Sequence, residues 1–203
     1  TRVEVGLTRL LPVWHSRMPE SIGPVRSVRP VDAAIVDPFH GVFVFSGGQV
    51  PFKNAAKATG LVISDEDTEM NNDTYYREKG RKAPWNLYFK AQDLQALYAD
   101  QQPSPQAGFA FDAIPTAVSE GVVAKGLSVK YPQMRSVWDL GTASFPWAEA
   151  LQTAWLRSQD GTPHTQVGGD QVAAKNVVVM EVVHDLSFVD PKYGAIPKAK
   201  LEN

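Results

Sequence analysis

The sequence has no cysteine, no long apolar run and little net charge, and each absence removes a class of function. Without cysteine among its 203 residues, the chain forms no disulfide and performs no thiol chemistry. Its net charge of -2 is too small for bulk electrostatic attraction to nucleic acid or to an anionic membrane surface. No stretch approaches the roughly 18 consecutive apolar residues of a membrane-spanning helix. A hydrophobic content of 43% still allows a buried core, so the sequence predicts a globular protein.

Short motifs for metals, nucleotides and nucleophilic serines are also missing. The four histidines are spread along the chain without a ligand spacing such as His-Glu-x-x-His. Neither a Walker phosphate loop nor a dinucleotide fingerprint occurs, and Ser46 has no Gly-x-Ser-x-Gly elbow around it. We therefore expect no metal and no cofactor.

The chain does contain a concentrated segment from Gly23 to Asp32, which is followed by an apolar stretch from Val42 to Gly48. The first part carries two arginines and a carboxylate between stiffening prolines, and the second reads as a strand that ends in Ser46-Gly47-Gly48. A helix is expected after this turn. The order of strand, glycine turn and helix suits an anion, because a helix N-terminus offers free backbone N–H groups. Many strands end in glycine turns, so this order alone is weak evidence.

Arginine is preferred to lysine early in the chain. Every cation before residue 53 is an arginine, including Arg9, Arg26 and Arg29. Arginine keeps its charge when partly buried and bonds carboxylate or phosphate through two N–H groups, which favours an anion site. The alternative is structural: Arg29 pairs with Asp32 and Arg26 with another acid, as buried charges commonly do.

A second segment, from Tyr75 to Phe89, interleaves basic and aromatic residues. It contains Arg81, Lys82 and Asn86. Such a mixture can bind single-stranded nucleic acid or a sugar polymer. The alternative is an ordinary structured loop whose aromatic residues pack and whose cations are solvated.

Local patterns predict an α+β fold in two parts. Residues 1–107 are expected to form a mixed α/β region with a central sheet, residues 108–203 are expected to be β-rich, and Gln101 to Ala107 is the expected linker. Ser64 to Asp73 is expected to be a solvated acidic loop, because it lacks the glycine and distal glutamate of a calcium loop. The expected helices cover residues 31–36, 51–59, with Gly60 as a left-handed cap, and 91–100. The expected strands cover residues 41–45, 122–131, 135–140, 153–157 and 176–183.

Four ordered motifs resemble the YerB-like family of bacterial lipoproteins. They are Gly6-Leu7-Thr8-Arg9-Leu10, the segment from Gly23 to Pro30, the segment from Val42 to Gly48, and Arg81-Lys82-Ala83-Pro84-Trp85-Asn86-Leu87-Tyr88; the run Asn176 to Val179 is similar to the family's C-terminal part. The resemblance implies a two-part protein outside the cytoplasmic membrane, anchored or secreted, whose biochemical activity is not established. It also implies an upstream signal peptide and lipid-attachment cysteine, and glycine-rich strands after Asn203, none of which this sequence contains. Trp85 stands where the family's motif has histidine, which argues against histidine-based catalysis there.

Three functions follow as expectations. The first is binding of an anionic ligand, such as a cell-wall glycopolymer or its precursor, by Arg9, Arg26, Arg29, Ser46, Gly47, Gly48, Arg81, Lys82 and Asn86, with Asp32 beside them. The second is a hydrolase or transferase on phosphate-containing envelope polymers, with Asp32 or His40 as the acid or base. The third is an interaction scaffold that presents Trp147 and Trp155 from the β-rich part. Nucleic acid is not an expected partner, and a membrane is expected only through an anchor outside this chain.

Overall fold

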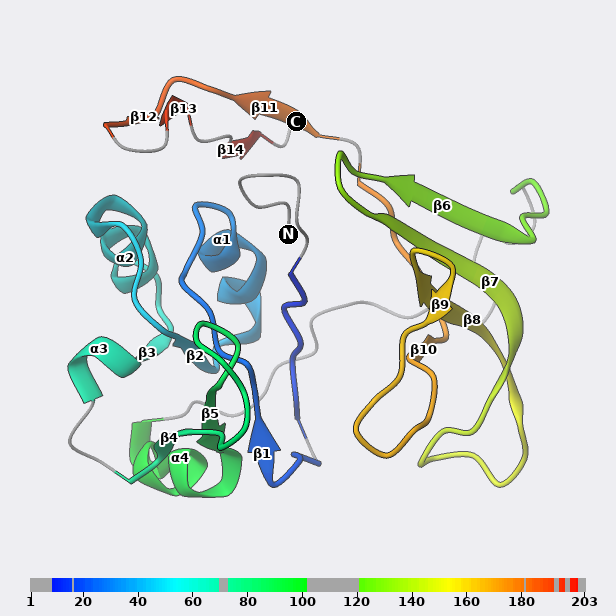
Figure 1. Ribbon diagram of the computed structural model, residues 1–203, viewed down its shortest axis with the longest axis horizontal. Helices are drawn as coiled ribbons and strands as arrows, with labels where there is room; N and C mark the ends of the chain where they lie inside the picture. The colour runs from blue at the N-terminus through cyan, green and yellow to red at the C-terminus, as the bar shows by residue number, and fades with distance from the viewer. Residues whose placement is uncertain are drawn as a thin grey trace. The chain divides into compact units, whose positions relative to one another are not determined.

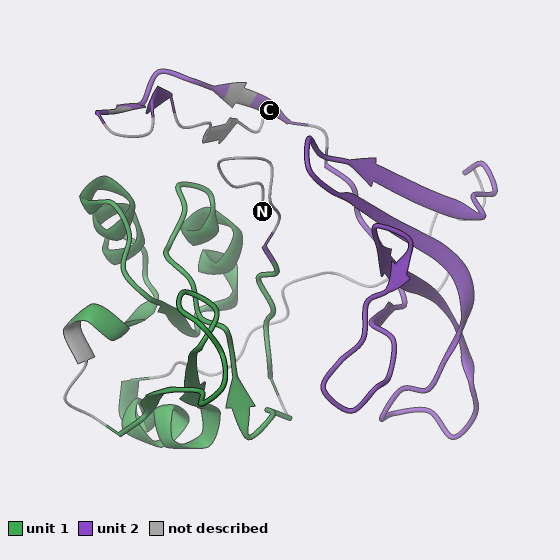
Figure 2. Cartoon of the chain, viewed as in Figure 1, with its two compact units in different colours: residues 1, 10–110 green, residues 2–9, 111–203 purple. Residues whose placement is uncertain are grey.

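The structure is a computed structural model of a chain with two compact units. Unit 1 comprises residues 1 and 10–110, and unit 2 comprises residues 2–9 and 111–203 (Figure 2). The fold is α+β, as the sequence predicts, and every helix in the described part of the chain belongs to unit 1. The residues that the structure describes are 9–15, 17–69, 73–101, 121–180, 182–191, 194–195 and 198–200.

A parallel strand pair joined by a helix forms one part of unit 1 (Figure 1). β2 (Val42–Phe45) pairs with β3 (Val62–Asp65), and α2 (Val50–Lys57) connects them. The valines and phenylalanines of β2 favour a strand, and a proline suits the first turn of α2, where its missing N–H needs no partner. Because the strands are parallel and in register, Phe45 and Asp65 bring their carboxyl ends side by side.

Short helical elements flank this pair. α1 (Asp32–Val36) leads directly into the 3₁₀ turn η2 (Asp37–Phe39), and His40 ends that turn in a left-handed conformation with φ of 49°. α3 (Glu66–Glu69) follows β3 without a break. The end of β3 therefore pairs with β2 and continues directly into α3.

An antiparallel sheet supplies the rest of unit 1. Its strand order is β1 (Ser21–Ile22), β5 (Leu87–Lys90) and β4 (Tyr75–Arg77), and α4 (Ala91–Leu97) and the 3₁₀ turn η3 (Ala99–Gln101) follow β5. The core of this part is the buried cluster of Phe89, Ala91 and Leu94. Val42 and Val44 of β2 pack against the same cluster, so the two sheets share one core.

Unit 2 is built on a meander of antiparallel strands. β6 (Gly126–Lys130), β7 (Arg135–Ala143) and β8 (Gln152–Gln159) pair in chain order, and β9 (Thr162–Pro163) and β10 (Ala173–Ala174) both pair with β8. Two short ladders come later: β11 (Val183–Asp185) with β14 (Lys198–Lys200), and β12 (Val189–Asp190) with β13 (Gly194–Ala195). The turn Asp160-Gly161 has positive φ at both residues, as a tight hairpin requires.

Several sequence predictions are confirmed and others are wrong. The three predicted helices and the strands around residues 41–45, 135–140 and 153–157 are present. The predicted acidic loop is wrong at its start, because Ser64 and Asp65 complete β3 and the next residues form α3. Gly60 is not a left-handed cap, and residues 176–180 do not form a strand. Residues 102–107 of the expected linker lie outside the described residues.

Among the described residues, no helix combines the length and the apolar character needed to cross a membrane.

Candidate functional site

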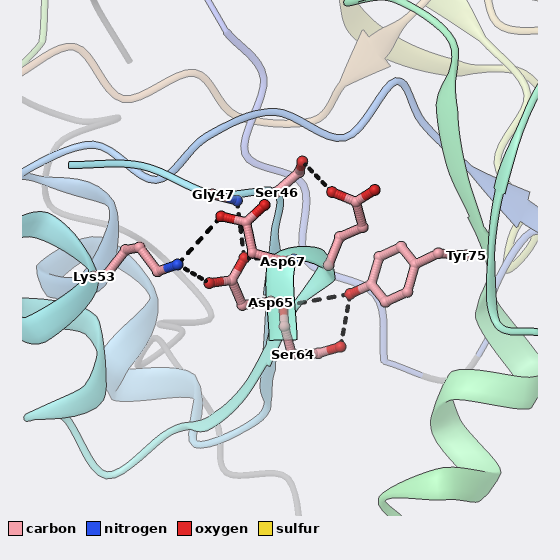
Figure 3. Close-up of polar contacts among 8 residues, drawn as sticks. Ser46, Gly47, Lys53, Ser64, Asp65, Asp67 and Tyr75 are labelled. Carbon is pink, nitrogen blue, oxygen red and sulfur yellow. Dashed lines mark hydrogen bonds and ion pairs between the residues drawn. The ribbon is translucent and has the colours of Figure 1, made fainter. Parts of the chain in front are cut away.

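The turn after β2 lies next to the carboxyl end of β3, and polar groups from both meet there (Figure 3). Gly47 and Gly48 adopt φ values of 65° and 148°, which side-chain-bearing residues rarely take. A Cβ on Gly48 would lie 2.7 Å from Cγ1 of Val28, and one on Gly47 would lie 2.8 Å from a carboxylate oxygen of Asp67. Two glycines are therefore needed here for both conformation and space.

The carboxylate of Asp65 organises this corner. It is 1% exposed, and its Oδ1 accepts the N–H of Gly47 at 2.8 Å and the N–H of Asp67 at 3.3 Å. Lys53, from α2, places its ammonium 2.7 Å from Oδ2 of Asp65 and 3.3 Å from Oδ2 of Asp67 (Figure 3). The hydrogen bond to Asp65 raises the pKa of Lys53, so the contact favours the charged form of the lysine beside this buried carboxylate.

A chain of polar contacts leads from the turn to the loop of residues 81–86. The hydroxyl of Ser46 donates to Oε2 of Glu66 at 3.0 Å, and Arg77 of β4 binds Oε1 of Glu66 at 3.1 Å. The other terminal nitrogen of Arg77 donates to Oδ1 of Asn86 at 3.3 Å. Ser46, Gly47 and Asn86, all predicted as ligand-binding residues, are therefore brought into one network, where they bind protein groups.

Tyr75 adds a second link between the sheets. Its hydroxyl lies 2.7 Å from Oγ of Ser64, which is fully buried, and it also donates to the carbonyl of Ser64 at 3.4 Å (Figure 3). The end of β3 is thus bonded to β4 as well as to the turn after β2.

Arg26 lies beside the turn with its side chain directed at the loop of residues 81–86. Its carbonyl accepts the N–H of Ser46 at 3.1 Å, which fixes the backbone of the two segments together. Its guanidinium donates to the carbonyl of Pro84 at 2.7 Å and lies 5.8 Å from the centre of the Trp85 ring. Burial lowers the pKa of Arg26, and the nearby charge of Arg29 lowers it further.

Arg29 and Asp32 have local structural contacts. The guanidinium of Arg29 donates to the carbonyls of Ser27 and Val28 at 3.2 Å and 3.1 Å. The buried carboxylate of Asp32 accepts the backbone N–H of Arg29 at 2.8 Å. These hydrogen bonds hold the segment from Ser27 to Asp32, which leads into α1.

The other predicted site residues have no hydrogen bond to this network among the contacts described. Arg81 places its guanidinium 5.7 Å from the centre of the Tyr88 ring, and Lys82 is exposed in the same loop. His40 ends η2, where its N–H binds the carbonyl of Asp37. Arg9 belongs to unit 2, whereas the other predicted site residues belong to unit 1.

Sequence reasoning missed Lys53, Asp65, Glu66 and Arg77 as parts of this corner. The signal that predicts them is the parallel arrangement: polar residues that follow two neighbouring parallel strands meet at one edge of the sheet. In the described part of the chain, no group of three or more acidic or histidine side chains is arranged to hold a metal ion. The two buried carboxylates of the corner, Asp65 and Glu66, instead form ion pairs with Lys53 and Arg77.

Unit 2 contains a buried arginine with a different environment. Arg157 of β8 is 5% exposed; it contacts Nδ1 of His164, donates to Oε1 of Gln159 at 3.3 Å, and lies 5.9 Å from the Trp138 ring centre. Burial lowers the pKa of Arg157. Burial also lowers the pKa of His164, and the charge of Arg157 adds to that effect. His164 is thereby kept neutral as an acceptor for Arg157.

The two tryptophans predicted to line a binding surface differ in exposure. Trp147 is 71% exposed and stacks on Phe145 with ring centres 4.6 Å apart. Trp155 is only partly exposed, within β8.

Comparisons with known proteins agree on one relationship. The family model described as "Protein of unknown function (DUF3048) N-terminal domain" matches residues 1–104, and the model of the corresponding C-terminal domain matches residues 134–203. A protein of Bacillus subtilis (strain 168) named "Putative lipoprotein YerB" is 26% identical over 190 residues, which are 90% of this chain and 54% of that protein. The chain thus spans about half the length of that relative.

A solved structure shows the same fold. The crystal structure of YerB protein from Bacillus subtilis matches with a TM-score of 0.66 and 18% identity, over 92% of this chain and 60% of the solved one. At that identity the likeness concerns the fold.

Proposed function

The chain belongs to the DUF3048 family, and from that premise we propose that it is a cell-envelope protein that binds an anionic glycopolymer or its precursor. The name of the Bacillus subtilis relative describes a lipoprotein, which supports a location outside the cytoplasmic membrane. The binding surface is the loop of residues 81–86 together with Arg26, which we call the Arg26 surface.

The environment of the Arg26 guanidinium carries this proposal. Its partners in the described part of the chain are the Pro84 carbonyl and the Trp85 ring, and no carboxylate pairs with it there. Burial and the charge of Arg29 both lower its pKa, so its charge is stabilised less than in water. A phosphate or carboxylate beside it would compensate two neighbouring cations and form charge-assisted hydrogen bonds.

Neighbouring side chains extend this chemistry. Arg81 and Lys82 add two exposed cations, whereas Lys53 and Arg77 are already paired with acids. Trp85 is 58% exposed and offers an apolar face against which a sugar ring can pack while its charged group meets an arginine. The turn at Ser46 and Gly47 supports this surface through Glu66, Arg77 and Asn86.

Calorimetric titration with pyrophosphate and with a sugar 1-phosphate tests the anion site. We expect Arg26→Gln to weaken binding of both probes by about tenfold or more, since a hydrogen bond to a charged group contributes about 1.5–3 kcal/mol. Lys57→Gln is the control, because Lys57 is an exposed cation on α2 outside the Arg26 surface. Equal affinities of the parent and the Arg26→Gln protein for both probes would contradict the proposal.

The scaffold function is the second candidate, and the exposure of Trp147 favours it. A photo-crosslinking residue at position 147 should capture one defined partner in cells, whereas the same residue at position 167, a fully exposed position of unit 2, should not. Equal crosslinking at both positions would remove this candidate. The hydrolase or transferase function, with Asp32 or His40 as acid or base, stays a prediction.

A further inference from the structure

The sheet β1–β5–β4 has an outer face that the core does not use. Phe89 and Tyr75 point to the core, so their neighbours along the strands point to the opposite side. The register pairs Tyr76 with Tyr88 and Ser21 with Lys90, which places these four side chains together on the outer face.

Aromatic rings form a continuous track on this face, starting at the Arg26 surface. The guanidinium of Arg81 lies 5.7 Å from the centre of the Tyr88 ring, and the Tyr88 ring centre lies 6.0 Å from that of Tyr76. The hydroxyl of Tyr76 is hydrogen-bonded to the hydroxyl of Ser21. Cations therefore mark one end of the track, and a phenol and a hydroxyl mark the other.

The track ends at a cavity of about 300 Å³. Glu20, Ser21, Tyr76, Lys90, Gln92 and Asp93 line it. A second cavity of about 330 Å³ shares Gln92 and continues toward Met18. Each volume is at the lower end of the range for small-molecule sites, which is roughly 300–1,000 Å³.

The groups around the first cavity suit a neutral, hydroxyl-rich ligand. The carboxylate of Glu20 and the amide of Gln92 have no hydrogen-bond partner among the residues that the structure describes, and Lys90 lies 3.6 Å from Asp93. Glu20 and Asp93 carry two negative charges against the one positive charge of Lys90, and this net negative charge repels an anion. The cavity is therefore not a second phosphate site. Carboxylate, amide and hydroxyl groups together accept and donate hydrogen bonds as sugar hydroxyls require, and the Tyr76 ring offers an apolar face.

We infer that this cavity binds an uncharged sugar unit of the same ligand whose anionic group binds the Arg26 surface. The ligand class is a glycan in which a neutral sugar is joined to a phosphate or carboxylate, with the Tyr88 ring between the two subsites. The inference rests on the proposed function and adds the neutral half of the ligand to it.

Calorimetry on the full chain tests this with three classes of probe. These are inorganic phosphate, the 1-phosphates of maltose, cellobiose and chitobiose, and the same disaccharides without phosphate. The variants are the double change Glu20→Ala with Gln92→Ala, both at exposed positions, and Tyr76→Ser. Gln101→Ala is the matched control, because Gln101 is exposed at the end of η3 and lines neither cavity.

We expect at least one disaccharide 1-phosphate to bind tenfold or more tightly than inorganic phosphate. The double variant should lose that advantage and keep the parent's affinity for inorganic phosphate. Tyr76→Ser should show the same two affinities, and its melting temperature checks that it is folded. An advantage that survives in the double variant, or no advantage for any disaccharide phosphate, overturns the inference.

The two proposals fail in different ways. Phosphate binding that depends on Arg26 without any disaccharide advantage leaves the anion site standing and removes the sugar subsite. Disaccharide binding that depends on Glu20 and Gln92, with Arg26→Gln unchanged toward all probes, leaves the sugar subsite and removes the anion site.

Discussion

Asp65 in unit 1 and Arg157 in unit 2 are both buried charges, and the two units stabilise them differently. Asp65 has a lysine 2.7 Å away and accepts two backbone N–H groups. Arg157 is held by a neutral imidazole, a side-chain amide and an indole ring. Asp65 therefore depends on an opposite charge, whereas Arg157 depends on a partner that must stay uncharged.

This difference makes the two units sensitive to different changes. Removing one member of an ion pair leaves a buried charge uncompensated, which strongly destabilises a fold. A neutral histidine beside an arginine is instead sensitive to protonation, because a second positive charge would then lie next to the first. The stability of unit 1 should fall most when a member of its ion pair is substituted, and the stability of unit 2 should fall in mild acid.

The largest expected effect is that of Lys53→Met. It leaves the Asp65 carboxylate buried without its cation, so we expect the free energy of unfolding to fall by about 3–5 kcal/mol. Urea denaturation measures this change. Lys57→Met, at an exposed position on the same helix, should change stability by less than about 0.5 kcal/mol. Similar losses in both variants would show that the ion pair does not stabilise the turn.

Adding Asp65→Asn to Lys53→Met sharpens the same test. The amide keeps the oxygen that accepts the Gly47 N–H but carries no charge, so the double variant should recover part of the loss. A double variant less stable than Lys53→Met alone would mean that the carboxylate contributes without its lysine.

An intermediate effect is expected from Gly48→Ala. The new Cβ would meet Val28 at 2.7 Å and the backbone would stay at a φ of 148°, so we expect a loss of about 2–3 kcal/mol. Gly161→Ala in unit 2 is the comparison: its φ is also positive, at 82°, but nothing lies within 4 Å of the added Cβ. That variant should lose only about 1 kcal/mol. Thermal melts of both proteins measure the difference, and a larger loss for Gly161→Ala would contradict the crowding argument.

The smallest expected effect is the response of unit 2 to acid. The pKa of His164 in the folded protein is lowered by burial and by Arg157, so it lies below the value of about 6.5 expected in the unfolded chain. Above that pH His164 is neutral in both states and its contribution to stability is complete. As the pH falls below about 6.5, the unfolded state takes up the proton first, and the stability of unit 2 declines.

Hydrogen exchange at the Val172 amide, which binds the His164 carbonyl, measures this decline between about pH 7.5 and pH 5.5. Arg157→Met removes the neighbouring charge and should reduce the pH dependence. A pH dependence unchanged in that variant would show that Arg157 does not control His164.

The predictions that succeeded depended on local patterns. Alternating valine and phenylalanine predicts β2, because β-branched and aromatic residues favour strands. The backbones of Arg26 and Ser46, two of the predicted site residues, are hydrogen-bonded to each other. The role of the predicted site residues as ligand groups stays a prediction.

The predictions that failed depended on partners distant in the sequence. Ser64 to Asp73 reads as an acidic loop because acids are disfavoured in strands, yet pairing with β2 makes Ser64 and Asp65 the end of β3. Gly60 follows α2 as a cap would, but the chain leaves that helix without a left-handed residue. At β3, tertiary pairing overrode local preference.

The sequence by itself determined the α+β class, the main strands and helices and the lack of cysteine chemistry, because these depend on backbone preferences and on residue chemistry. Only the tertiary structure decided which charges are paired. Parallel pairing of β2 with β3 brings Asp65 and Lys53 together, and the sheet β1–β5–β4 aligns Tyr76 with Tyr88. An ion pair or a hydrogen bond requires its partners to lie within a few ångströms of each other, so it depends on distances that chain order does not specify.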